Sequence, residues 1–208
     1  MLPQLTSARL GAGSNTEVAE AVRLARHAIN VGKDDPDALS RAGWAIATLA
    51  GERALGLSAI ERALAINPNS ALAWGFRGWI EGFSNRPALA IEALQRAIRL
   101  SPLDPLRWTF WAALALAHLI AGRYEATIAW ADRALHENPA ADHALGFKAA
   151  ACSRLGRIEE GCECIKRFCE LRPGWTVAEV QAALRAAMSP EVLSIYLDGL
   201  RKAGLPEE

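Results

Sequence analysis

The sequence predicts an all-α protein, a right-handed α-α solenoid of stacked helix hairpins with capping helices at the carboxyl end. The first observation is a signal in which arginine and two small or apolar residues precede a proline, and its prolines are 34, 37 and 34 residues apart. The second is a small residue late in the second helix of the unit, and the third is the proline that closes it. Because such a unit cannot bury its own apolar face, neighbouring units must stack. The prolines are Pro68, Pro102, Pro139 and Pro173.

The second full unit shows the pattern most clearly. Gly78, Ala90 and Ala97 are small, which lets two antiparallel helices approach closely. Trp74 and Leu94 fill the space around that contact. Proline then ends the second helix, because it has no amide hydrogen to donate and its ring clashes with the preceding turn. Each unit is therefore expected to be a helix-turn-helix hairpin.

With these residues the chain resembles the tetratricopeptide repeat family. A partial repeat is expected at the amino end, entered through the capping box Ser14–Glu17, with its partner helix within Met1–Gly11. The Thr176–Glu179 stretch offers a second capping box. The expected division of the chain is 1–35 for the partial repeat, 36–70, 71–107, 108–141 and 142–175 for full repeats, and 176–208 for capping helices.

The carboxyl-terminal stretch from Ser189 to Glu207 carries a finer resemblance. It looks like the end of the repeat region that follows the catalytic domain in bacterial, especially rhizobial, class III adenylate and guanylate cyclases, and the likeness covers most of residues 16–208. No residues match a cyclase catalytic domain. The resemblance implies the regulatory or scaffolding portion of such a signalling protein without its enzyme.

Composition restricts the kinds of partner. The chain has 23 basic and 23 acidic side chains, so it has no overall charge with which to attract nucleic acid or an anionic membrane surface. The amino end lacks a basic start followed by a long apolar run, and no stretch approaches the roughly 18 apolar residues that a membrane span needs. We therefore expect a cytoplasmic protein that recognises another polypeptide by shape and local polarity.

Cysteines and histidines are the side chains that could carry chemistry. Cys162, Cys164 and Cys169 have poor spacing for a zinc site, because a Cys-x-x-Cys knuckle is missing, and Cys152 lies in the same unit. Free thiols in packing positions are expected, with no metal and no cofactor. The four histidines have no sequence-near nucleophile, and no phosphate-binding glycine loop is present. A small-molecule sensor or enzyme that uses His118, His143 or the cysteines stays an alternative.

The resemblance implies a concave groove lined by the first helix of each unit. Lysine and asparagine, which hold chaperone-tail carboxylates in related grooves, are missing from these positions, so we expect no such clamp. The apolar middle of the groove instead suits an apolar helix or an extended segment. The expected partner-binding residues are Leu72, Trp79, Phe83, Thr109, Ala112, Leu116, Ile120, His143, Ser153 and Arg154.

These inferences predict a non-catalytic scaffold for protein–protein interaction. Two alternatives concern the groove, because an open apolar patch is uncommon on a monomer. Either the chain's own flanking helices fill it, or a second copy buries it as a homodimer. A third alternative concerns the whole protein, which would be a regulatory or dimerisation segment of a nucleotide cyclase.

Overall fold

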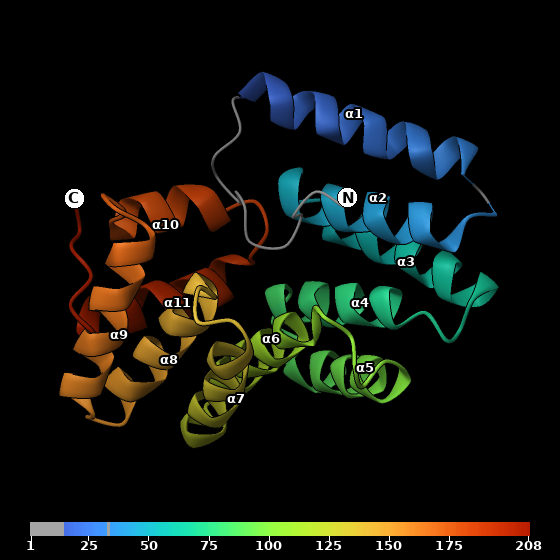
Figure 1. Cartoon of the computed structure of the whole chain (residues 1–208). Coiled ribbons are helices and arrows are strands. Elements are labelled where there is room, and N and C mark those ends of the chain that lie inside the picture. Colours follow the sequence, from blue (N-terminus) through green and yellow to red (C-terminus); the bar gives the residue numbers. More distant parts are fainter. Residues whose placement is uncertain (1–14, 33) are drawn as a thin grey trace.

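Within residues 15–32 and 34–208, which the computed structural model describes, the protein consists of eleven α-helices and no strand (Figure 1). The prediction of an all-α solenoid is confirmed. The partner helix expected within Met1–Gly11 and the first residue of the first capping box, Ser14, lie outside the described residues. The helices are α1 (Asn15–Val31), α2 (Pro36–Leu49), α3 (Arg53–Ile66), α4 (Ala71–Phe83), α5 (Pro87–Leu100), α6 (Arg107–Ile120), α7 (Tyr124–Glu137), α8 (Asp142–Arg154), α9 (Ile158–Leu171), α10 (Val177–Leu184) and α11 (Pro190–Lys202).

Consecutive helices pair as hairpins, α2 with α3, α4 with α5, α6 with α7 and α8 with α9, while α1 packs on α2. The first helices of the hairpins also contact each other in turn, α2 with α4, α4 with α6 and α6 with α8. They therefore form a continuous inner row, and the second helices lie outside it (Figure 1). This inner row is the concave side of the solenoid.

Small residues set the spacing inside the hairpins. Ala63, Ala97 and Ala134 occupy equivalent places in three second helices, and none of them is exposed to solvent. The backbones of one hairpin approach closely at Gly43 on α2 and Gly56 on α3. A Cβ atom on Gly43 would lie 2.6 Å from the Gly56 carbonyl oxygen, and one on Gly56 would lie 2.5 Å from the Gly43 carbonyl oxygen. Any larger side chain there would push the two backbones apart.

Helix ends follow from local sequence. Gly122 and Gly156 have φ angles of 69° and 71°, a left-handed conformation that glycine adopts without steric cost and that stops α6 and α8. The Thr176 side chain accepts a hydrogen bond from the Glu179 amide at 3.3 Å, so it caps α10 as the sequence predicts. Ser189 caps α11 in the same way, through the Val192 amide.

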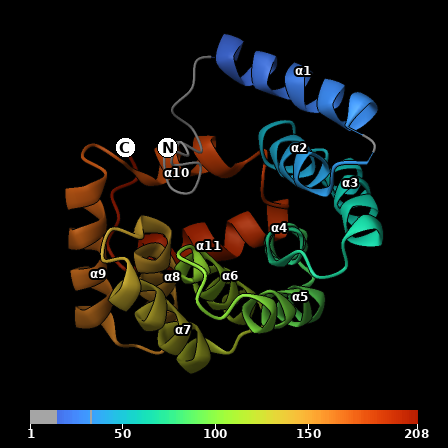
Figure 2. The same cartoon turned by 45° about the vertical axis from the view of Figure 1, so that its right-hand side comes forward.

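The chain after α9, residues 172–208, forms a C-terminal arm that includes α10 and α11. The arm turns back along the inner row of helices (Figure 2). Its main contact with the hairpins is made by α11 on α8, and α10 packs mainly on α11. The apolar face of α11 covers the fourth hairpin on its concave side.

Candidate partner groove

The structure places the expected partner-binding residues on α4, α6 and α8, and it leaves few of them open to solvent. Ala112 and Leu116 are fully buried, and Phe83, Thr109 and Ser153 are buried to more than nine-tenths. The remaining five are partly buried: Leu72, Trp79, Ile120, His143 and Arg154. The concave side is therefore a packed interior rather than an open channel over much of its length.

Aromatic rings connect the inner helices across this side. Trp79 of α4 lies 5.3 Å from the Phe83 ring and 5.7 Å from the His143 ring of α8, measured between ring centroids. His143 also lies 5.6 Å from Trp108 of α6. Phe147 of α8 continues the contacts to Tyr196 of α11, at 5.2 Å. Such ring pairs stabilise the packing of the inner helices by more than their buried area alone contributes.

Two glycines let α11 approach α8 closely. A Cβ atom on Gly146 of α8 would lie 2.0 Å from the Tyr196 hydroxyl oxygen. A Cβ atom on Gly199 of α11 would lie 2.4 Å from the Cβ atom of Ala150 on α8. Each helix thus supplies one glycine that receives a side chain of the other. The groove at α8 is shaped to α11 at both of these points.

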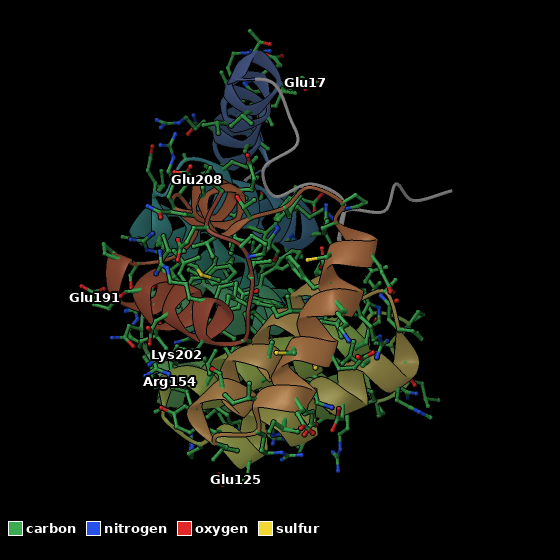
Figure 3. All side chains as sticks on the ribbon, turned by 90° about the vertical axis from the view of Figure 1, so that its left-hand side faces the viewer. Glu17, Glu125, Arg154, Glu191, Lys202 and Glu208 are labelled. Atoms are coloured by element: carbon green, nitrogen blue, oxygen red, sulfur yellow. The ribbon has the colours of Figure 1, made fainter. Side chains whose placement is uncertain are left out.

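Polar groups hold the carboxyl half of α11. The Ser153 hydroxyl donates to the Gly199 carbonyl at 3.1 Å, and Arg154 pairs with Asp198 at 2.6 Å. Lys202 reaches the same carboxylate at 3.0 Å, and Figure 3 shows it close to Arg154. The hydrogen bond from Lys202 lowers the pKa of Asp198, and the charge of Arg154 lowers it further. Asp198 is therefore ionised at neutral pH.

The segment of the arm between α10 and α11 is tied to the first two hairpins. The Ser189 amide donates to the Phe83 carbonyl at 2.7 Å, at the end of α4. The Arg53 guanidinium at the start of α3 donates to the carbonyl oxygens of Ala186 and Ala187, at 3.1 and 3.3 Å. The arm therefore bridges the groove from the fourth hairpin back to the first.

His143 belongs to a structural ion cluster. Its Nδ1 atom lies 3.1 Å from Asp142 Oδ1, and Arg172 pairs with the other carboxylate oxygen. Burial alone would raise the pKa of Asp142, but hydrogen bonds and charges from His143 and Arg172 outweigh burial and lower the pKa. This cluster fixes the start of α8 against the end of α9.

The other side chains considered for chemistry lie in packing positions. Burial lowers the pKa of His118, and the nearby charge of Arg123 adds to this effect. Burial also raises the pKa of Cys152 to about 11, which keeps that thiol protonated at neutral pH. Within the described ranges, no group of three histidine, cysteine or acidic side chains could hold a metal ion.

Sequence reasoning missed three residues that matter here. Asp198 and Gly199 lie on α11 among apolar residues at helical spacing, and a glycine inside such a pattern is the signal that could have marked the close contact. Glu81 of α4 is buried beside Arg86 and Arg77. Burial raises the pKa of Glu81, while the charges of Arg86 and Arg77 oppose that rise.

Comparison with known proteins finds a family that the hairpins resemble. The family model of the tetratricopeptide repeat matches residues 49–102 and 77–143. The matched residues, 49–143, resemble tetratricopeptide repeats. A search of curated protein sequences finds no match. Nothing in these comparisons supports the resemblance to cyclase repeat regions.

Several solved structures are similar in fold over most of the chain. PilW, described as a type IV pilus biogenesis factor, has a TM-score of 0.65 at 15% identity and covers 88% of this chain and 91% of its own. MamA from Desulfovibrio magneticus RS-1 has a TM-score of 0.58 at 20% identity, covering 74% and 85%. YrrB, described as a TPR protein with an unusual peptide-binding site, has a TM-score of 0.55 at 16% identity, covering 88% and 91%. At these identities the likeness concerns the fold alone.

No described helix is both long and apolar enough to span a bilayer.

Proposed function

We propose that this protein is a non-catalytic scaffold for protein–protein interaction, whose apolar concave groove holds one helix of a partner polypeptide. The observation that carries the proposal is the position of α11. An amphipathic helix already lies on the concave side, against α8 and across to the end of α4. The groove thus has the width and the apolar lining that a helix requires.

The energetics of α11 support a helix as the occupant. Five large side chains of α11 are buried, and each contributes about 1.5 to 3 kcal/mol on full burial. They recur at helical spacing, so a helix presents all five to the groove at once. They are Val192, Leu193, Tyr196, Leu197 and Leu200.

The rigid inner row favours binding over catalysis. Stacked helices lose little conformational entropy when a ligand docks, which leaves more of the contact energy for affinity. The zero net charge makes nucleic acid and anionic membrane surfaces poor partners, as the sequence predicts. The partly buried His118 and the buried Cys152 and Cys164 lie in packing positions, and His143 belongs to the ion cluster of α8. No cofactor is part of the proposal.

Site-specific photo-crosslinking in living cells tests this function. A photoreactive phenylalanine analogue is placed at Leu72 or Ile120, two partly buried groove positions, and at Gln95 on the exposed face of α5 as a matched control. We expect both groove positions to give the same crosslinked polypeptide, identified by mass spectrometry, and the control position to give none. Crosslinks that are absent, or equal at all three positions, would contradict the groove as the binding site.

A further inference from the structure

We infer that α11 is an intramolecular ligand that competes with the partner, and that the partner presents a helix of the same chemistry as α11. This inference rests on the proposed function. The partner helix carries apolar residues spaced like Val192, Tyr196 and Leu200. It carries a small residue in the place of Gly199 and a carboxylate in the place of Asp198.

Steric fit sets the apolar part of this pattern. Gly146 leaves room for an aromatic side chain in the place of Tyr196, because the hydroxyl end of that ring fills the space a Cβ atom would need. Ala150 leaves no room for a side chain opposite it, so the occupant must be glycine or nearly as small there. A helix without both features cannot come as close to α8 as α11 does.

Charge sets the polar part. Arg154 lies on the groove wall, and Asp198 is its partner on α11 through the Nη2 atom. The Nε atom of Arg154 is buried and has no hydrogen-bond partner among the described residues. The Nε2 atom of His143 is also buried without a hydrogen-bond partner there. Buried polar atoms without hydrogen bonds destabilise a complex. A partner helix whose carboxylate pairs with Arg154 Nη2 and also accepts a hydrogen bond from the Nε atom would satisfy a nitrogen that α11 leaves without a hydrogen bond, which favours the exchange.

The arm can leave the groove without separating any hairpin. It joins the repeats covalently only after α9, through residues 172–176, where Gly174 has a φ angle of 78°. Its helix α10 packs mainly on α11, so the two helices can move together. A tethered helix is present at an effective concentration of about 1 mM, so a partner in solution must overcome that competition.

A labelled peptide measures the competition directly. The probe is a fluorescent peptide of residues 189–205, titrated by anisotropy against three full-length chains: wild type, Gly199→Leu and Gly146→Leu. Gly199→Leu weakens α11 and leaves the groove intact, whereas Gly146→Leu fills the groove itself. We expect the peptide to bind Gly199→Leu at least about tenfold more tightly than wild type, because its internal competitor is released, and to bind Gly146→Leu no better than wild type.

Charge exchange tests the recognition pattern. A peptide with Asp198→Arg should bind the Gly199→Leu chain more weakly than the unchanged peptide does, because Arg154 then faces a like charge. It should regain binding to a Gly199→Leu/Arg154→Asp chain, because the ion pair is then restored with reversed signs. A purely apolar association would show no such exchange.

Hydrogen exchange of the α11 amides reports whether the arm has left the groove. If Gly199→Leu leaves the arm docked, Leu197→Asp is a second substitution that should release it. The inference is overturned if the arm is released and the peptide still does not bind more tightly. An arm that stays docked in both variants also overturns it, as does a released chain that dimerises by exchanging arms, measured by light scattering. A partner crosslinked at Leu72 and Ile120 would stand in any of these cases, so the proposed function and this inference fail separately.

Discussion

The α2–α3 hairpin and the α8–α11 contact both depend on glycine, but they use it differently. In the hairpin, Gly43 and Gly56 bring two backbones together, so that each carbonyl oxygen occupies the space of the other's missing Cβ atom. In the groove, Gly146 and Gly199 each receive a side chain. The first contact joins neighbours in sequence, and the second joins residues that are far apart. Glycines that admit a neighbouring backbone therefore build the repeats, whereas glycines that admit a side chain allow α11 to fill the concave side.

The largest expected effect lies in the hairpin. Gly43→Leu should lower the free energy of unfolding by about 3 kcal/mol or more, because the new side chain meets the Gly56 backbone, which cannot move aside as a flexible side chain can. Urea denaturation followed by circular dichroism measures the change. Because the solenoid unfolds through contacts between neighbours, the loss should appear as reduced overall stability rather than as a local change.

Gly82→Ala is the matched control for that substitution. Its Cβ atom would meet the nearest side-chain atom, Leu116 Cδ2, at 3.6 Å, an ordinary contact. We expect this change in α4 to be neutral or to stabilise by up to about 1 kcal/mol, because alanine is favoured over glycine within a helix. If Gly43→Leu and Gly82→Ala lowered the free energy of unfolding equally, the close approach of the two backbones would not determine the stability of the hairpin.

An intermediate effect is expected in the groove. Gly199→Ala should weaken the docking of α11 by about 1 to 3 kcal/mol, because even a methyl group overlaps Ala150. Hydrogen exchange followed by mass spectrometry should show faster exchange for α11 amides and unchanged exchange for α2 and α3. Uniformly faster exchange in all helices would mean that the arm is part of one cooperative unit with the hairpins.

The same contrast explains what could be predicted from the sequence. The hairpins repeat, so the small residues Ala63, Ala97 and Ala134 recur 34 and 37 residues apart, and together with the prolines they reveal the helical solenoid. The arm occurs once. Its apolar spacing predicts a helix that covers the fourth hairpin, but no periodicity indicates that it covers the concave side or reaches Phe83. Groove residues such as Leu116 could be assigned to α6 from the repeat pattern, whereas their burial depends on long-range packing.

A smaller and pH-dependent effect is expected at the start of α8. The folded pKa of Asp142 is lowered, so its contribution to stability is present above the unfolded pKa of about 4 and is lost as the pH falls through the folded value. Asp142→Asn should cost about 1 to 2 kcal/mol at pH 7, because the ionised carboxylate that pairs with Arg172 and accepts a hydrogen bond near His143 is removed. Thermal denaturation from pH 7 to 2.5 measures this. The stabilities of wild type and Asp142→Asn should converge towards pH 2.5. A difference that stays constant with pH would exclude the ionised Asp142 carboxylate as its cause.

The smallest expected effect distinguishes the contribution of the ion pair from that of steric fit in holding α11 in the groove. The Arg154–Asp198 pair is partly exposed, so Arg154→Gln should weaken the docking of α11 by only about 0.5 kcal/mol. Lys166→Gln, which removes a more exposed pair with Glu163, is the control and should have no measurable effect. Hydrogen exchange of α11 at low and high salt measures both variants. The difference between Arg154→Gln and wild type should shrink as salt screens the pair, whereas the Gly199→Ala effect should persist. If the two effects respond equally to salt, steric fit cannot be the main force that holds α11 in the groove.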